Sequence, residues 1–167
     1  LRPKTLDDYI GQKHLVGQGA VLRKMIDAGR VPSFILWGPP GVGKTTLAQI
    51  IANKLDAPFY TLSAISSGVK DVREVIEKAK SNRFFNTVSP ILFIDEIHRF
   101  SKSQQDSLLN AVETGVVTLI GATTENPSFE VIRPLLSRCQ VYVLKSLDKN
   151  DLLTLLHKAV SYTHLTL

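Results

Sequence analysis

The sequence predicts an α/β fold in which a five-stranded parallel sheet lies between helices. Five short apolar runs rich in β-branched residues have the length of buried strands. Segments with the periodicity of amphipathic helices separate these runs, and such alternation is typical of a parallel sheet covered on both faces. The predicted strands are Phe34–Trp37, Phe59–Leu62, Ile91–Ile94, Val117–Ala122 and Val141–Leu144.

The segments between the predicted strands account for the helices of this fold. The segment after the first strand carries its apolar residues on one helical face, as do Asp71–Lys80 and Ser103–Glu113. Gly115 is the predicted C-cap of the last of these helices. The polar stretch around Pro127 and Pro134 is predicted to be a long loop between the fourth and fifth strands.

The chain divides into three parts. Residues 1–146 hold all five predicted strands and form the α/β subdomain. Asp148 can cap a further helix over Leu152–Val160, and because no strand follows, residues 147–160 are predicted to begin a separate helical unit. Residues 161–167 break the helical pattern, and we expect them to be a non-native tail without a role in function.

Composition sets limits on the function. The 167 residues are 44% hydrophobic and 21% charged, which is ordinary for a globular domain. Cys139 is the one cysteine, so no internal disulfide can form, and a reducing, cytoplasmic location is expected. The net charge of +5 permits an anionic partner such as DNA, but the basic residues are scattered and favour such a partner only weakly.

A phosphate-binding loop follows the first predicted strand and opens a helix, which is the context that the motif G-x-x-x-x-G-K-[ST] requires. Its glycines let backbone N–H groups turn toward an anion at the helix N-terminus. Lys44 is predicted to reach the β- and γ-phosphates, and the Thr45 hydroxyl to ligate Mg²⁺. A simple Gly-Pro turn has no need of this Lys-Thr pair, so the chain is predicted to bind a nucleoside triphosphate. The loop comprises Gly38, Pro39, Pro40, Gly41, Val42, Gly43, Lys44, Thr45 and Thr46.

Two adjacent carboxylates, Asp95 and Glu96, end the third predicted strand. Asp95 can hold the Mg²⁺ shell, as the corresponding aspartate does in phosphate-loop enzymes. Glu96 can orient and deprotonate a water molecule, which a kinase would not need because its substrate brings the nucleophile. The pair therefore favours ATP hydrolysis. A GTPase is a weaker alternative, since the guanine-reading Asn-Lys-x-Asp pattern is absent from the sequence.

Two further polar groups are candidates on weaker grounds. The fourth strand ends in Thr123 and Thr124, whose hydroxyls could lie beside a γ-phosphate or could simply begin the following turn. Arg138 precedes the fifth strand, and the residues alone favour a solvated surface charge over a functional group.

Together these motifs resemble AAA+ ATPases of the clamp-loader branch. Within that branch the sequence is most similar to the replication-associated recombination protein A family, which includes the eukaryotic Werner-helicase-interacting ATPase. The resemblance covers residues 1 to about 160. Of the five stretches that carry it, Lys102–Asp106 and Gly121–Phe129 are specific to this family. The stretches are Arg2–Gln12, Ile35–Gly41, Phe93–Phe100, Lys102–Asp106 and Gly121–Phe129.

The resemblance implies an AAA+ phosphate-loop NTPase core over residues 1–146 and the start of its helical lid over 147–160. It implies that the N-terminal segment packs on adenine, with a pocket edge at Tyr9 and Ile10. A polar residue at the position of Ser63 restrains the catalytic glutamate in related ATPases.

The resemblance also assigns roles to the weaker candidates. It implies a γ-phosphate sensor at Thr124, with Thr123 next, and a finger at Arg138 that reaches into a neighbouring subunit. Val131–Pro134 departs from the family pattern, where small or polar residues are expected, so the local geometry before Arg138 stays open.

For the whole protein, the resemblance implies Mg²⁺-dependent ATP hydrolysis that DNA stimulates at stalled replication forks, in recombination and in repair. The implied partners are DNA forks or single-strand/double-strand junctions, single-strand-binding protein, and further copies of the chain joined through regions beyond residue 160. The expected location is the bacterial cytoplasm, at the nucleoid. A sliding-clamp-loader subunit and a Holliday-junction branch-migration motor are alternatives, since each shares one of these motifs.

Overall fold

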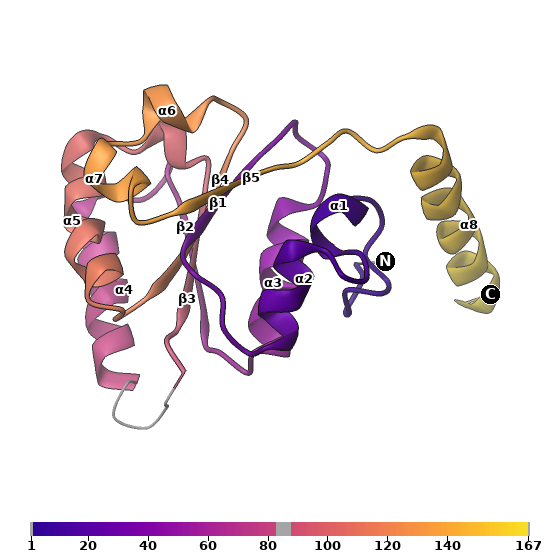
Figure 1. Cartoon of the computed structure of the whole chain (residues 1–167), viewed down its shortest axis with the longest axis horizontal. Helices are drawn as coiled ribbons and strands as arrows, with labels where there is room; N and C mark the ends of the chain where they lie inside the picture. Colours follow the sequence, from indigo (N-terminus) through magenta and orange to yellow (C-terminus); the bar gives the residue numbers. More distant parts are fainter. Residues whose placement is uncertain (1, 83–87, 167) are drawn as a thin grey trace.

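The protein is described by a computed structural model over residues 2–82 and 88–166. Within these residues, five strands form a parallel sheet in the order β2-β3-β4-β1-β5 (Figure 1). All five predicted strands are present, and their ends differ from the prediction by one residue at most. The strands are β1 (Phe34–Trp37), β2 (Phe59–Ser63), β3 (Ile91–Asp95), β4 (Thr118–Thr123) and β5 (Gln140–Val143).

The helices confirm the main predictions and add short elements. The helix after the phosphate loop and the two other predicted helices are present as α3, α4 and α5, whereas α1 and α2 were not predicted. The described helices are α1 (Lys13–Val16), α2 (Val21–Asp27), α3 (Lys44–Lys54), α4 (Val69–Asn82), a 3-10 turn η1 (Ile97–Arg99), α5 (Lys102–Glu113), α6 (Pro127–Glu130), α7 (Arg133–Leu136) and α8 (Lys149–Thr166).

The prediction of one long loop between β4 and β5 is wrong. The one-turn helices α6 and α7 occupy much of this segment, with Pro127 and Pro134 in their first turns. Proline interrupts a helix interior but fits the first turn, because its fixed φ is helical and the amide proton it lacks has no acceptor there.

The last helix is longer than the sequence predicts. Asp148 is the predicted cap, and it exchanges hydrogen bonds with Asp151: each carboxylate accepts from the other residue's amide, at 2.7 and 3.1 Å. The predicted end of this helix at Val160 is wrong, because α8 continues through Thr166. The helix is already nucleated by its cap, so residues of low intrinsic propensity extend it.

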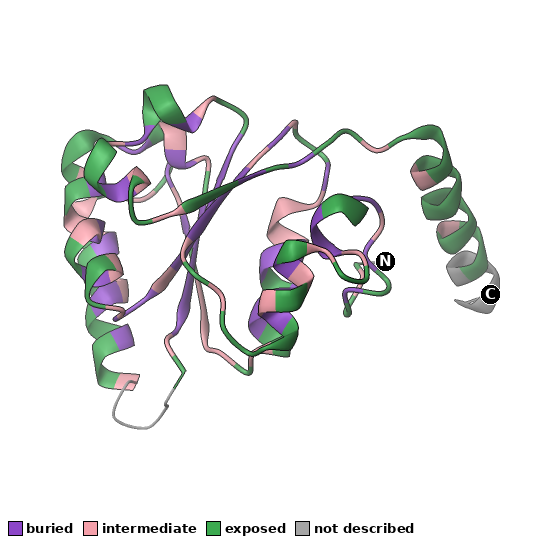
Figure 2. Cartoon of the chain, in the orientation of Figure 1, coloured by how far each residue is buried: buried purple, intermediate pink, exposed green. Residues whose placement is uncertain are grey.

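Two hydrophobic clusters cover the two faces of the sheet. Phe34 and Leu36 point into the cluster beneath α1, α2 and α3, whereas Ile35 points into the cluster beneath α4, α5 and α7. Successive strand residues face opposite sides, so a strand buried on both faces is a continuous apolar run. The central strands β1, β3 and β4 are therefore buried along most of their length, whereas the edge strands β2 and β5 are partly exposed and α8 is largely exposed (Figure 2).

No helix in the described part of the chain is both long enough and apolar enough to cross a membrane.

Gln12 fastens the N-terminal segment to the linker that leads to α8. Its side-chain amide donates to the carbonyl of Lys145 at 2.7 Å and accepts from the amide of the same residue at 2.9 Å. Gln12 is buried, so both bonds are protected from water. A second contact joins the segment to α8 itself, because the Lys158 ammonium donates to the carbonyl of Asp8 at 2.9 Å.

We expect Gln12→Leu to lower the free energy of unfolding by about 1–3 kcal/mol, because it leaves two backbone groups of Lys145 without their partner. Urea denaturation of the chain measures this change. Gln18→Leu is the matched control, since Gln18 is exposed and its substitution is expected to change stability by less than about 0.5 kcal/mol. Equal denaturation midpoints for the two variants would contradict the role of Gln12.

Candidate nucleotide-binding and catalytic site

The phosphate loop connects β1 to α3 at the carboxyl edge of the sheet. Gly41 and Gly43 adopt φ values of +81° and +85°, a left-handed conformation that residues with a Cβ rarely adopt. Gly38 is required for a different reason, because a Cβ there would lie 2.7 Å from the Cβ of Leu144. Three glycines of the motif are thus fixed by backbone geometry, and Gly43 is also the N-cap residue of α3.

Lys44, the first residue of α3, is held within the loop by backbone carbonyls. Its ammonium donates to the carbonyl oxygens of Gly38 and Pro39 at 2.7 and 2.8 Å. Burial lowers the pKa of Lys44, and the charge of Asp95 acts in the opposite direction. The parallel pairing of β3 with β4 and of β4 with β1 puts the end of β3 at the same edge of the sheet as the phosphate loop.

A cavity of about 780 Å³ lies beside the loop, and it is lined by the N-terminal segment, the phosphate loop, the linker after β5 and α8. This volume falls within the range of small-molecule sites, roughly 300–1,000 Å³. The cavity brings Tyr9 and Ile10 to the loop, as expected for a pocket that holds the base of a nucleotide. Its lining residues are Arg2, Pro3, Lys4, Asp8, Tyr9, Ile10, Gly41, Val42, Gly43, Thr46, Leu147, Leu155, Lys158 and Ala159.

The Tyr9 hydroxyl also contacts the phosphate loop directly, which the sequence did not predict. Its hydroxyl lies 2.7 Å from the carbonyl oxygen of Val42 and 3.1 Å from that of Gly43, and donates to these loop carbonyls. Burial raises the pKa of Tyr9, so the phenol remains a protonated donor at neutral pH. A tyrosine in the N-terminal segment thereby supports the phosphate loop, and only tertiary structure could show this contact.

Asp95 is the last residue of β3 and Glu96 follows it, at the same edge of the sheet. Asp95 is exposed and pairs in register with Ser63 at the end of β2. Glu96 has a φ of +53° and a ψ of +48°, a left-handed conformation that is strained for a residue with a side chain. Such strain is concentrated at functional sites, where the surrounding structure imposes it. The Glu96 carboxylate lies 3.8 Å from the guanidinium of Arg99.

The two candidate sensor threonines are in different environments. Thr123 is 1% exposed, and its hydroxyl is hydrogen-bonded to His98 Nδ1 and to the amide of Glu125, both at 2.9 Å. Thr124 is exposed immediately after β4. The structure therefore leaves Thr124 accessible to a ligand and engages Thr123 inside the protein.

Arg138 lies apart from the other candidates. It is exposed, and its guanidinium pairs with the carboxylate of Glu113 at 3.3 Å. Gln140, two residues on, pairs with Phe34 at the amino end of β1, whereas the phosphate loop follows the carboxyl end. Because the two ends of a parallel strand are at opposite edges of the sheet, Arg138 is at the edge away from its own loop.

The stretch Val131–Pro134, which departs from the family pattern, packs on the core. Val131 is buried, and the amide of Ile132 donates to Oε1 of the buried Gln105 at 2.8 Å. The same glutamine donates to the carbonyls of Phe100 and Glu130, at 3.1 and 3.0 Å. The unexpected apolar residues therefore anchor the segment that leads to Arg138.

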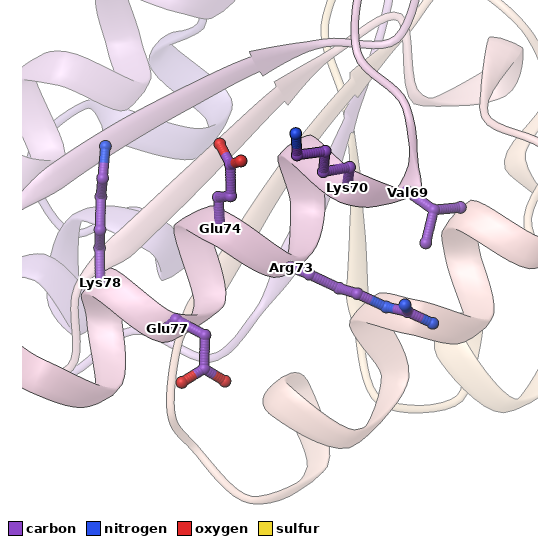
Figure 3. Close-up of a pocket in the computed structure, with 6 residues that line it drawn as sticks. All are labelled: Val69, Lys70, Arg73, Glu74, Glu77 and Lys78. Atoms are coloured by element: carbon purple, nitrogen blue, oxygen red, sulfur yellow. The ribbon is translucent and has the colours of Figure 1, made fainter.

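A second hollow lies on the exposed face of α4, well away from the phosphate loop (Figure 3). Its charged side chains point outward along the helix and do not converge on a common centre. Lys70, Glu74 and Lys78 recur at four-residue spacing with alternating charge, a pattern that stabilises a solvated helix. We therefore place the functional site at the carboxyl edge of the sheet.

The residues at that edge suit a magnesium ion that binds with a nucleotide. Among the described residues, no group of three or more His, Cys, Asp or Glu side chains is arranged to hold a metal. Mg²⁺ in nucleotide sites takes one or two protein ligands and completes its shell with water and substrate phosphates. Asp95, exposed beside Lys44, and Thr45, in the first turn of α3, fit that description.

This fold and this site define a phosphate-loop NTPase domain. Residues 34–147 match the ATPase family associated with various cellular activities (AAA), and the chain belongs to this family. The predicted fold class, an AAA+ core, is confirmed.

Relatives confirm the more specific resemblance. Over 160 residues the chain is 54% identical to the replication-associated recombination protein A of Haemophilus influenzae, covering 96% of this chain and 36% of that protein. It is 52% identical to the ATPase WRNIP1 of Dictyostelium discoideum, with coverage of 99% and 19%. The chain therefore spans about a third or less of the length of these relatives.

A solved structure has a similar fold. The RuvB Holliday junction branch migration motor of Thermotoga maritima superposes with a TM-score of 0.68 at 33% identity, covering 87% of this chain and 48% of that one.

We expect Tyr9→Phe to weaken ATP binding about tenfold. The substitution removes the tyrosine donor from the Val42 carbonyl and one of two donors from the Gly43 carbonyl, which also accepts from the amide of Leu47. A hydrogen bond contributes about 1–1.5 kcal/mol, and tenfold in affinity corresponds to about 1.4 kcal/mol. Titration with a fluorescent ATP analogue measures the change. Tyr142→Phe is the matched control, because Tyr142 is also buried, its hydroxyl lies 3.6 Å from the sulfur of Met25, and neither of these residues lines the cavity. Equal affinities for the two variants would refute the contact's role.

Proposed function

We propose that the chain is the nucleotide-binding domain of a Mg²⁺-dependent, DNA-stimulated ATPase. The observation that carries this proposal is that the phosphate loop and the carboxylates of Asp95 and Glu96, at the end of β3, lie at the same edge of the sheet. The opposing effect of Asp95 on the pKa of Lys44 and the strained backbone of Glu96 are its physical signs.

Each residue at this edge has a proposed role. Lys44 leaves its carbonyl acceptors and contacts the β- and γ-phosphates, while Thr45 and Asp95 hold Mg²⁺. Mg²⁺ bound there supplies positive charge to the phosphate oxygens. Glu96 accepts a proton from the attacking water, and the exposed Thr124 contacts the γ-phosphate. Ser63 is proposed to restrain Glu96, supported by its register pairing with the preceding Asp95.

The proposed setting is DNA replication and its repair. The name replication-associated recombination protein A, carried by relatives that share about half of the residues, supports action at stalled forks and in recombination. We propose DNA forks or junctions as the nucleic-acid partner, single-strand-binding protein as a possible protein partner, and assembly with further copies of the chain. The proposed location is the bacterial nucleoid.

A second candidate function is Holliday-junction branch migration. The similarity to the RuvB motor favours it, since that structure shares the fold over most of this chain. Identity of 33% to the motor, against 54% to the recombination protein, favours the first proposal. Comparison of DNA-stimulated turnover on forks and on four-way junctions separates the two functions.

We expect Glu96→Gln to retain Mg-ATP binding and to lower hydrolysis at least a hundredfold, because an amide cannot accept the proton of the water. Lys44→Ala is the companion variant and is expected to lose nucleotide binding itself. Analogue titration and phosphate release on the full-length protein measure the two effects. Turnover near wild type in Glu96→Gln would move the catalytic base to another residue.

We expect Arg138→Ala to lower turnover by about 10³–10⁵, the contribution of an arginine finger, and to leave ATP affinity unchanged. Because Arg138 is at the edge away from its own loop, its target must be in a neighbouring subunit. Mixing Arg138→Ala with Glu96→Gln protein should therefore restore part of the activity, since mixed interfaces join an intact finger to an intact base.

The control for this mixing experiment is subunit exchange, followed by energy transfer between labelled copies. If subunits exchange and no mixture exceeds either variant alone, Arg138 does not act between subunits and is a surface charge paired with Glu113.

A further inference from the structure

His98 has a defined partner but no role in the function proposed above. It lies in η1, two residues after the proposed base Glu96. Its Nδ1 is 2.9 Å from the hydroxyl oxygen of Thr123, the last residue of β4. This hydrogen bond joins the turn that carries Glu96 to the strand that precedes Thr124.

Thr123 connects three parts of the site. Its backbone carbonyl accepts from the amide of Gly38, the first residue of the phosphate loop, at 3.1 Å. Its hydroxyl accepts from the amide of Glu125 at 2.9 Å, which closes the turn that contains Thr124. With the contact to His98, the phosphate loop, the catalytic turn and the sensor turn all meet at this one residue.

Because Thr123 is buried, its hydrogen bonds do not compete with water. The residue is 1% exposed. The hydroxyl has one proton: it can donate to an unprotonated His98 Nδ1, or it can accept from a protonated Nδ1 and donate to the carbonyl of Glu125 at 3.2 Å. Either imidazole tautomer therefore maintains the link.

Backbone hydrogen bonds and apolar packing also support the catalytic turn. The amide of Arg99 donates to the carbonyl of Glu96 at 2.8 Å, and the amide of Ala64 donates to the carbonyl of Asp95 at 3.2 Å. Ile97 is fully buried, and a Cβ added at Gly121 of β4 would lie 3.1 Å from its Cδ1. This apolar contact packs the turn against β4 but does not fix the orientation of the turn. The hydrogen bond between His98 and Thr123 is directional, so it can fix the orientation of the turn. The turn includes Glu96, whose φ is +53°.

We propose that His98 and Thr123 are positioning residues that fix Glu96 and Thr124 relative to the phosphate loop. This inference rests on the proposed function, since it concerns the geometry of the same hydrolytic site. It also divides the roles of the two threonines: Thr124 contacts the nucleotide, and Thr123 aligns the groups that do. Neither His98 nor Thr123 touches the substrate.

The experiment compares isosteric variants in the full-length protein. His98→Phe and Thr123→Val remove the hydrogen bond and retain most of the volume of each side chain. We expect each to lower kcat tenfold or more, with the affinities for ATP and ADP within twofold of wild type. The double variant is expected to be no slower than the slower single variant, because both substitutions break one link.

Two conservative variants and one matched control complete the design. Asn places a polar atom at the position of Nδ1 and Ser retains the hydroxyl, so His98→Asn and Thr123→Ser should recover most of kcat. His14→Phe is the control, since this histidine is also bonded to an acceptor, the carbonyl of Val143 at 2.8 Å, but lies outside the proposed site. It should leave kcat unchanged.

Three results would overturn the inference: wild-type kcat in His98→Phe; multiplicative effects in the double variant; or loss of ATP and ADP affinity in parallel with a lowered Tm, which indicates a purely structural role. Glu96→Gln separates this inference from the proposed function. If that variant hydrolyses ATP normally, the proposed base is wrong. If it is inactive while His98→Phe and Thr123→Val are fully active, only the positioning role is wrong.

Discussion

The parallel pairing of β1 with β4 and β5 is the constraint on which the site depends. Parallel strands bring their carboxyl ends to one edge of the sheet, so the phosphate loop after β1 lies beside the residues that follow β4. The bond from the amide of Gly38 to the carbonyl of Thr123 continues this pairing one step into the loop. The same register places Arg138 at the opposite edge of the sheet. Arg138 is therefore too far from the proposed site of its own domain to act there.

The N-terminal segment couples the nucleotide cavity to α8. Tyr9 donates to the phosphate loop, Gln12 clamps the linker after β5, and the carbonyl of Asp8 accepts from Lys158 of α8. Within a few residues the segment thus contacts the loop, the linker and the helix that enclose the cavity. The bonds of Tyr9 and Gln12 are buried or partly buried, whereas the bond of Lys158 is exposed.

The sequence predicts the elements whose signals are local. The central strands β1, β3 and β4 are continuous apolar runs because both of their faces are buried. The phosphate loop has fixed spacing because its glycines have fixed backbone conformations. Contacts between distant segments leave no such signal. The hydroxyl of Tyr9 on the loop, the clamp of Gln12 and the separate environments of Thr123 and Thr124 depend on strand order and packing. Pro127 and Pro134 indicated a loop because proline is read as a breaker, although it is also favourable in a first turn.

The energies of two interactions are relevant to the proposed role of Arg138: its pair with Glu113 and its proposed contact with a phosphoryl group. Its pair with Glu113 joins exposed side chains at 3.3 Å, and such surface pairs contribute about 0–1 kcal/mol. An arginine that stabilises the charge of a transferring phosphoryl group contributes on the order of 10³–10⁵ in rate, or about 4–7 kcal/mol. The second contribution exceeds the first several-fold, so the pair with Glu113 would not prevent the proposed contact of Arg138 with a neighbouring subunit. The neighbouring Cys139 is half-buried, and burial raises the pKa of its thiol to about 12, which keeps it neutral against the core. A fixed backbone with a weakly held side chain is what the proposed contact between subunits requires.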